Sequence, residues 1–412
     1  MGRKAGVKAS ARGASDAAAP RVAPDPRATP APAPTREQRL ERQAYALGFD
    51  LVGFVRLGPA ETAAHFDDWI ANGRHADMQY MARDAELRHD TRRPHPGAVS
   101  AIVVTMDYGG RQPRGPVARY ARGDDYHDVM KERLQALHAW LSADVGAAID
   151  GRAYVDTAPI LERDLARRAG LGWFGKNTNL INPTRGSYFF IGSLFVAMEL
   201  VASTPFEGDK CGGCTRCLKA CPTGAFVAPK VLDATQCISY LTIENRAAIP
   251  EPLRERVGEW LYGCDICQDV CPYNRKFSLP LTELRFAPRP VVDGMDARSL
   301  ARRLLGMSVA EYTESFRGSP MKRAKFSGLR RNAAVVLGNV GLVDDAPALI
   351  AALRDESSLV RGHAAWALGR LGSSLAATAL RERLVDEPDP DVRDEISSAL
   401  RARDELPDSI SK

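Results

Sequence analysis

The stretch that organises this chain begins with CGGCTRCLKACP at residues 211–222. It continues with a single cysteine, Cys237, and closes with CDICQDVCP at residues 264–272. All eight cysteines of the protein fall within this stretch. Thiols gathered in one segment at short, regular spacings indicate a bound inorganic cofactor.

The spacing CxxCxxCxxxCP is typical of bacterial proteins with two 4Fe-4S clusters, in which the fourth cysteine binds the neighbouring cluster. The second half-motif, CDICQDVCP, lacks its first member, and we expect Cys237 to take that place. The crossover rule then predicts two groups of ligands. The first group is Cys211, Cys214, Cys217 and Cys271, and the second is Cys221, Cys237, Cys264 and Cys267.

Zinc is the nearest alternative, since paired CxxC elements also form tetrahedral zinc sites. CxxC pairs alone, however, require neither a third close cysteine nor a proline after the last one. A disulfide framework is the remaining alternative, and it is typical of small secreted domains rather than of a chain of 412 residues. The pattern therefore favours iron-sulfur clusters.

Length and composition are those of an ordinary protein of two or three domains. Of the net charge of +5, residues 1–34 contribute +4 through six Lys or Arg and two Asp, so the body is nearly neutral. These residues are rich in Ala and Pro, and we expect a disordered tail, with a transit peptide as a minor alternative. No apolar run approaches the roughly 18 residues of a membrane span, so we expect no membrane association.

Helical and strand patterns alternate between residues 35 and 203 and predict an α/β layer architecture. The expected helices are at 35–47, 65–72, 125–141 and 159–170. The expected strands are at 50–56, 101–107, 151–156 and 188–200, the last one interrupted at Gly192.

Three features of this region are candidates for a site. The Gly-rich segment 170–179 follows a helix rather than a strand, so it fits neither a dinucleotide nor a phosphate loop, and a surface turn is the simpler interpretation. The triplet Asp125-Tyr126-His127 is similar to the start of a DxHxxG cobalamin element, but Met130 stands where Gly is needed. Asp156 follows a strand, where charged groups often face a ligand crevice; the alternative is a helix N-cap.

Four segments resemble the epoxyqueuosine reductase family, and the resemblance runs from about Thr35 to beyond Gly341. They are RYARGDDYH at 119–127, VDTAPILERDLARRAGLGWFGKN at 155–177, CISYLTIE at 237–244 and YGCDICQDVCPYN at 262–274. The reductive dehalogenases, which combine a similar cobalamin domain with a similar ferredoxin module, are the nearest relatives of that family.

The resemblance implies reduction of epoxyqueuosine to queuosine in the anticodon loop of tRNA, in the cytoplasm. Electrons would pass from an external donor of unknown identity through two 4Fe-4S clusters to cobalamin. The family assigns the proton donor to the position of Asp156, whose pKa we expect a corrin face and a docked nucleoside to raise. The cofactor-binding residues implied are Tyr126, His127, Asp156, Gly172, Trp173, Gly175, Lys176, Asn177 and Ser239.

The C-terminal quarter carries a repeat at residues 329–341, 360–372 and 392–402. Matching Ala and Gly positions predict closely packed helical hairpins, similar to the HEAT repeats of the family. A helical cap of the core is the alternative. Basic residues also gather here, and such a stripe suits a phosphate backbone. We expect Lys322, Arg323, Lys325, Arg330 and Arg331 to bind tRNA, with Arg361 and Arg370 continuing the stripe.

These observations predict four parts: a tail at 1–34, a cobalamin-binding α/β domain at 35–203, a ferredoxin-like double 4Fe-4S domain at 204–285, and a HEAT-like helical domain at 286–412. Two other functions remain open, a small-molecule reductive dehalogenase and a simple electron-transfer ferredoxin. Binding of tRNA separates the first hypothesis from both alternatives.

Overall fold

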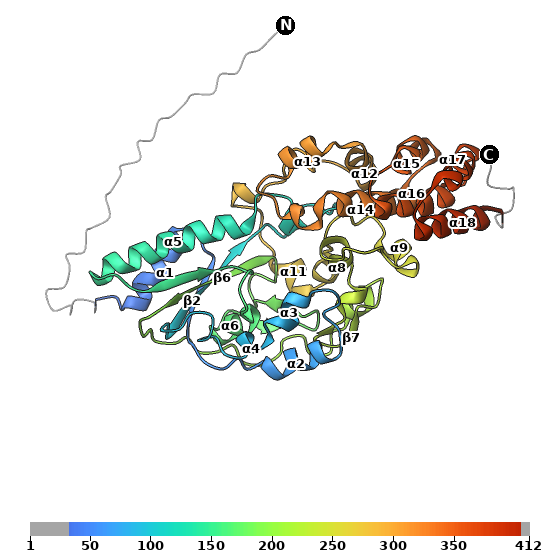
Figure 1. The fold of residues 1–412 in the computed structure, drawn as a ribbon. Helices are drawn as coiled ribbons and strands as arrows, with labels where there is room; N and C mark the ends of the chain where they lie inside the picture. Colours follow the sequence, from blue (N-terminus) through green and yellow to red (C-terminus); the bar gives the residue numbers. More distant parts are fainter. Residues whose placement is uncertain (1–32, 405–412) are drawn as a thin grey trace, which may run out of the picture.

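The computed structural model describes residues 33–404, which form an elongated molecule with a sheet at one end and a stack of helices at the other (Figure 1). The predicted disordered tail lies outside the described residues apart from its last two positions. Within the described part, no helix combines the length and the apolar character that crossing a membrane requires.

The sheet at one end has four strands in the order β1 (Leu51–Arg56), β2 (Ser100–Asp107), β6 (Phe189–Val196) and β3 (Gly151–Tyr154). All neighbouring strands are antiparallel, whereas alternating helices and strands commonly give a parallel sheet. The predicted α/β layers are therefore present, and the structure adds the strand directions, which the prediction left open. The connections are long enough to return the chain in either direction, so the order of elements alone did not decide them.

Helices cover both faces of this sheet (Figure 1). On one face lie α1 (Arg36–Ala46), which opens with a capping box at Thr35, and α5 (Tyr126–Val145). On the other face lies α6 (Glu162–Arg168). Strand β6 is continuous, so the predicted interruption at Gly192 is wrong. A side chain at Gly192 would crowd Met130 and Leu134 of α5, and the glycine therefore lets that helix approach the sheet.

The cysteine-rich segment forms short elements around the thiols. They are α7 (Arg216–Ala220), β7 (Phe226–Ala228), β8 (Val231–Leu232), α8 (Ile238–Ile243), α9 (Glu251–Val257), α10 (Ile266–Asp269) and α11 (Pro272–Phe277). Between this segment and the sheet lie α2 (Ala63–Ala71), α3 (Gln79–Arg83), α4 (Ala85–Arg88) and the small pair of strands β4 (Trp173–Phe174) and β5 (Leu180–Ile181).

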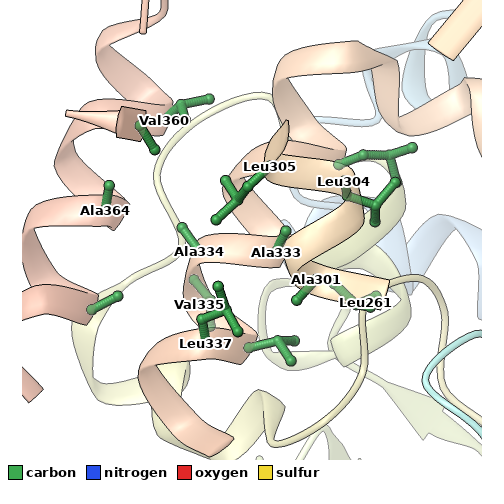
Figure 2. Packing of buried hydrophobic residues seen from close by; sticks show 14 of the residues in the cluster. Leu261, Ala301, Leu304, Leu305, Ala333, Ala334, Val335, Leu337, Val360 and Ala364 are labelled. Atoms are coloured by element: carbon green, nitrogen blue, oxygen red, sulfur yellow. The ribbon is translucent and has the colours of Figure 1, made fainter. Parts of the chain in front are cut away.

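The C-terminal helices are α12 (Ala297–Gly306), α13 (Val309–Ser315), α14 (Lys325–Val340), α15 (Ala346–Ala352), α16 (Ser358–Leu371), α17 (Ser374–Asp386) and α18 (Pro390–Asp404). The three sequence repeats correspond to α14, α16 and α18, which pack side by side. Figure 2 shows how small and branched side chains of α14 fill the space between α12 and α16. A side chain at Gly338 would overlap the ring of Trp366, so the close approach of α14 and α16 requires this glycine.

The helical stack also packs against the cysteine-rich segment. Asn332 of α14 donates through Nδ2 to the carbonyl oxygens of Thr242 (2.8 Å) and Leu261 (2.9 Å). Arg254 of α9 forms an ion pair with Glu395 of α18. One continuous apolar core runs through both parts, so the repeats form a stack and at the same time cap the cysteine-rich segment.

Candidate functional site

The eight cysteines are all free thiols, which excludes the disulfide framework. Cys237 and Cys271 cap the N-termini of α8 and α11. Across residues 33–404, no group of three or more His, Cys, Asp or Glu side chains converges on a single metal ion. Zinc needs four donors around one ion, whereas a 4Fe-4S cluster holds its four thiols around a larger core, so the two alternatives differ in the spacing of their thiols.

The first set of neighbouring thiols surrounds Cys217. Burial raises the pKa of Cys217, and the nearby thiols of Cys211 and Cys271 raise it further. Burial likewise raises the pKa of Cys271, where Cys211 and Cys214 are the neighbouring thiols. Three cysteines of the first half-motif and the last cysteine of the second one therefore lie together.

The second set surrounds Cys264. Burial raises the pKa of this thiol, and Cys237 and Cys221 act on it as close neighbours. Burial also raises the pKa of Cys267, with contributions from Cys264, Cys237 and, from the other set, Cys217. These neighbours are compatible with the two groups of four that the crossover rule predicts, and Cys217 and Cys267 bring the groups close together; the assignment of each ligand stays a prediction. The donor set fits two 4Fe-4S clusters.

Trp173 belongs to the surroundings of the first group of thiols. Its indole is 1% exposed, packs against Phe206 and Tyr273, and donates from Nε1 to Sγ of Cys211 at 3.5 Å. Lys176 donates through Nζ to the carbonyl oxygen of Gly212 at 2.6 Å. We expected both residues to form a wall of the cobalamin site; they face the first cysteine group instead.

The rest of the Gly-rich segment is also structural. Asn177 is buried, and its Nδ2 donates to the carbonyl oxygen of Cys267 at 3.4 Å. Side chains at Gly172 or Gly175 would overlap Ile181 of β5. The segment is a buried junction between the sheet and the thiols, so the interpretation as a surface turn is wrong. The sequence did not reveal this because glycines that permit close packing look like glycines of an exposed turn.

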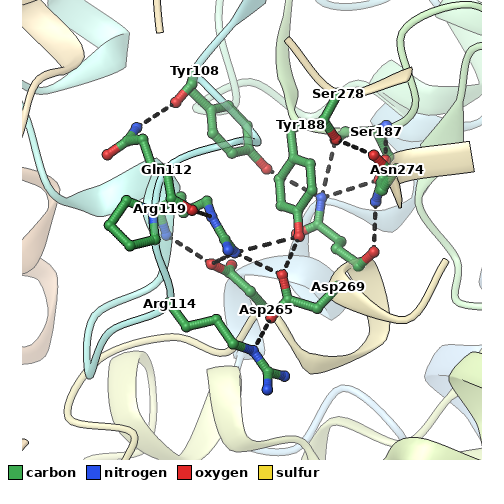
Figure 3. A network of polar contacts seen from close by, with 12 residues as sticks. Tyr108, Gln112, Arg114, Arg119, Ser187, Tyr188, Asp265, Asp269, Asn274 and Ser278 are labelled. Carbon is green, nitrogen blue, oxygen red and sulfur yellow. Dashed lines mark hydrogen bonds and ion pairs between the residues drawn. The ribbon is translucent and has the colours of Figure 1, made fainter. Parts of the chain in front are cut away.

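A buried polar network joins the sheet to the second group of thiols (Figure 3). Arg119 is 5% exposed and pairs through Nη1 with Asp265 at 2.9 Å and Asp269 at 2.8 Å, on either side of Cys267. The hydroxyl of Tyr188 donates to Asp269 at 2.7 Å. Arg119 lies in the segment RYARGDDYH, but its partners are about 70 to 150 residues away and could not be inferred from that segment. The network balances the two carboxylates and fixes α10 against β6.

Asp156 lies two residues after β3, next to Tyr126 and His127 of α5. The hydroxyl of Tyr126 donates to Asp156 Oδ2 at 2.7 Å, and His127 Nε2 lies 3.4 Å from the same oxygen. The backbone of Asp156 has a φ of +56°, which is uncommon for a residue other than glycine, and its N–H donates to Glu162 Oε1 at 2.6 Å. Leu161, not Asp156, caps α6, so the helix-cap alternative is wrong.

The site lowers the pKa of one carboxyl group, that of Asp156, and raises the pKa of another, that of Glu162. Enclosure by the protein raises the pKa of Asp156, but hydrogen bonds from His127 and Tyr126 outweigh it, so the pKa lies below its ordinary value of 3.8. Burial and the charge of Asp156 raise the pKa of Glu162 to about 8. The hydrogen bonds from His127 and Tyr126 thus favour the ionised form of Asp156; the raised pKa that we expect with a corrin and a nucleoside docked stays a prediction. The sequence did not single out Glu162, although it lies in the segment that carries the resemblance.

The Asp156 side chain is 62% accessible to solvent, yet it is enclosed enough for desolvation to be the largest influence on its pKa. It is therefore open to a ligand. Both nitrogens of His127 are engaged, Nδ1 with Asp125 at 2.6 Å and Nε2 with Asp156. No imidazole is free here to act as a lower cobalt ligand, while hydroxyl, imidazole and carboxyl groups suit the amide side chains of a corrin. Ser239 instead lies beside Cys237, where its hydrogen bond lowers the pKa of that thiol against the larger effect of burial.

The basic residues expected to bind tRNA occupy two environments. Lys322, Arg323 and Lys325 are exposed. Arg330 is half-buried and pairs with Asp355. Arg331 is 1% exposed, and its donors are engaged by buried carbonyl groups, so its expected contact with phosphates is wrong.

Three family models match the chain. They describe a 4Fe-4S double cluster binding domain at residues 210–274, epoxyqueuosine reductase QueG, DUF1730 at 88–157, and HEAT repeats at 321–401. An epoxyqueuosine reductase from Xanthomonas campestris is 40% identical over 84% of this chain and 98% of its own. One from Pseudomonas aeruginosa is 41% identical over 83% of this chain and 97% of its own. A crystal structure of epoxyqueuosine reductase with an epoxyqueuosine-modified tRNA-Tyr stem loop superposes with a TM-score of 0.82 at 30% identity, over 89% of this chain and 98% of that one.

Proposed function

The chain belongs to the epoxyqueuosine reductase family, and on that premise we propose that it reduces epoxyqueuosine to queuosine in the anticodon loop of tRNA. The observation that carries the proposal is the similarity over more than four fifths of the chain, together with a structural relative bound to a modified tRNA stem loop. The same similarity disfavours a small-molecule dehalogenase. Because tRNA is the substrate, we place the reaction in the cytoplasm.

The reaction takes up two electrons and two protons, removes the epoxide oxygen as water and leaves an alkene. Bound clusters supply single electrons, and bound cobalamin supplies a reduced metal centre for the epoxide. We assign Cys211, Cys214, Cys217 and Cys271 to one cluster and Cys221, Cys237, Cys264 and Cys267 to the other. In this proposal Tyr126, His127 and Asp156 contact cobalamin and the modified base. The Gly-rich segment and Ser239 pack against the cysteines that hold the clusters.

Asp156 is the proton donor to the departing oxygen in this proposal. Asp156 would lose solvent when a nucleoside and a corrin are docked beside it, and desolvation raises the pKa of a carboxyl group. Glu162, whose pKa of about 8 leaves it largely protonated near neutrality, lies one hydrogen bond from the Asp156 backbone. Lys322, Arg323 and Lys325 remain our candidates for phosphate contacts, and we retain the division at residues 34, 203 and 285.

Replacing Asp156 by Asn tests the assignment, because the amide keeps the shape and lacks the transferable proton. Turnover of epoxyqueuosine-containing tRNA should fall about a hundredfold or more, while iron content and cobalamin binding stay unchanged. Asp128, exposed on α5, gives the matched control Asp128→Asn, which should keep full activity. Near-normal turnover of Asp156→Asn would remove Asp156 from the chemistry. A parent protein that binds the cofactors but converts no epoxyqueuosine would contradict the proposed function itself.

A further inference from the structure

The first group of thiols is surrounded by exposed cations. Each is close in sequence to one of its cysteines, and consecutive Cα atoms are only 3.8 Å apart, so none can lie far from the cluster that these cysteines hold. None of them forms an ion pair within the part of the chain that the structure describes. We call this set the cationic rim; its members are Lys210, Arg216, Lys219, Arg275 and Lys276.

Contacts between the elements bring the rim together. Lys210 precedes α7, which carries Arg216 and Lys219, and α7 packs on α10. The hydroxyl of Tyr273 in α11 donates to the carbonyl oxygen of Lys210 at 3.3 Å, so α11, with Arg275 and Lys276, lies beside the same loop. The cations thus come from two segments, about 60 residues apart in sequence, that meet at the first group of thiols.

The loop at the centre of the rim carries two glycines, which have no side chains. Gly212 and Gly213, between Cys211 and Cys214, are exposed, and no atom lies within 4 Å of where a Cβ would stand on either. Gly212 also has a φ of +48°, a left-handed conformation that favours glycine. Lys176 contacts the carbonyl oxygen of Gly212, but on the sides where the Cβ atoms would stand a partner can approach the backbone closely. Electron transfer falls steeply with distance, so close approach matters.

The charges on either side of Cys267, in the second group of thiols, are arranged differently. The carboxylates of Asp265 and Asp269 point inward and pair with the buried Arg119. An acidic partner is therefore attracted to the rim rather than to the carboxylates beside the second group, which are already paired.

We propose that the cationic rim is the docking surface for an acidic, one-electron carrier protein that reduces the first cluster. The inference rests on the proposed function, which requires an external donor. Opposite charges steer two proteins into contact and accelerate association. In each encounter the reduced carrier loses one electron and the first cluster gains it, with no bond made or broken. Two encounters supply the two electrons of one turnover.

The test measures anaerobic reduction of the reconstituted holoenzyme in a stopped-flow spectrometer, with reduced plant-type 2Fe-2S ferredoxin as the acidic carrier. The double variant Lys219→Glu/Lys276→Glu reverses two charges of the rim. Its reduction at low salt should be at least about tenfold slower than that of the parent, and less sensitive to salt. The variant Arg354→Glu/Arg381→Glu, at exposed positions in the C-terminal helices, makes the same change in net charge and should behave as the parent.

Reduction by dithionite, which needs no docking surface, and iron content should be the same in all three proteins. If iron content falls in the rim variant, the milder Lys219→Gln/Lys276→Gln replaces it, with a smaller slowing expected. Equal ferredoxin rates in parent and rim variant would overturn the proposal. So would a loss of tRNA affinity without slower reduction, because the rim would then be an RNA surface. The assay contains no epoxyqueuosine, so its outcome is independent of whether the proposed function holds.

Discussion

Arginine and lysine side chains at the start of the C-terminal helices and those inside the stack look alike in the sequence, but their environments differ. At the start, Lys322, Arg323 and Lys325 are exposed, and Arg323 pairs with Glu244 while remaining 51% accessible. Inside, Arg331 and Arg361 are buried. The exposed cations at the start are available to a nucleic acid, and the buried arginines stabilise the fold.

The buried arginines have two kinds of partner, carbonyl oxygens and a carboxylate. Arg331 donates to the carbonyl oxygens of Leu241 (2.6 Å), Asn245 (3.0 Å) and Ala247 (2.7 Å), at and beyond the C-terminal end of α8. A cation is favourable there because unpaired carbonyl groups concentrate at a helix C-terminus. Burial lowers the pKa of Arg331 only to about 9, so it stays charged at neutral pH. Arg361 instead pairs with the buried carboxylate of Glu387.

The largest effect is expected from Arg331→Met, which leaves three buried carbonyl groups without a donor. We expect a loss of unfolding free energy on the order of 3 kcal/mol, and a Tm lower by about 4 °C. Calorimetry on the holoenzyme measures it, with the exposed Arg381→Met as control. An unchanged Tm combined with weaker tRNA binding would show that Arg331 belongs with the exposed group after all.

A second, smaller effect is expected at Glu387. Burial raises the pKa of its carboxyl group, but hydrogen bonds from Arg361, Asp389 and Arg383 outweigh this and lower the pKa to about 2, from an ordinary value of 4.5. Because the folded-state pKa is depressed, the stabilisation is present above pH 4.5 and is lost as the pH falls towards 2. In Glu387→Gln this part of the acid-induced loss of Tm should be absent. A variant with the same acid profile as the parent would show that the pair contributes nothing.

The smallest effect on stability is expected at the exposed start of the stack. Replacing Lys322 and Lys325 together by Gln should leave Tm unchanged and weaken tRNA binding, with the salt dependence of the affinity reduced by about one to two counterions. Filter binding over a range of salt concentrations measures it. Lys219→Gln, in the cationic rim, is the matched control and should leave tRNA binding unaltered. An unchanged salt slope in the double variant would remove the start of the stack from the tRNA surface.

At Asp156, too, the environment of a side chain could not be inferred from the sequence around it. The sequence placed Asp156 near a strand end and the resemblance assigned its role, but neither revealed that Tyr126 and His127 would lower its pKa. The shift depends on groups 29 and 30 residues away that α5 brings within hydrogen-bonding distance. Side-chain partners of this kind are set by packing between elements, which no local pattern encodes.

By itself, the sequence determined what depends on neighbours along the chain: the two sets of thiols, the capped helix after Thr35, the strands β1 and β2, and the helical repeats. Spacing, capping and hydrophobic periodicity are local, so they can be read in one dimension. Only the tertiary structure decided the antiparallel direction of the strands, the placement of Trp173 against Cys211 rather than beside Asp156, and which cations are buried. A charged side chain costs so much to bury unpaired that its location depends on partners far away in sequence. Those partners become neighbours only when the chain folds.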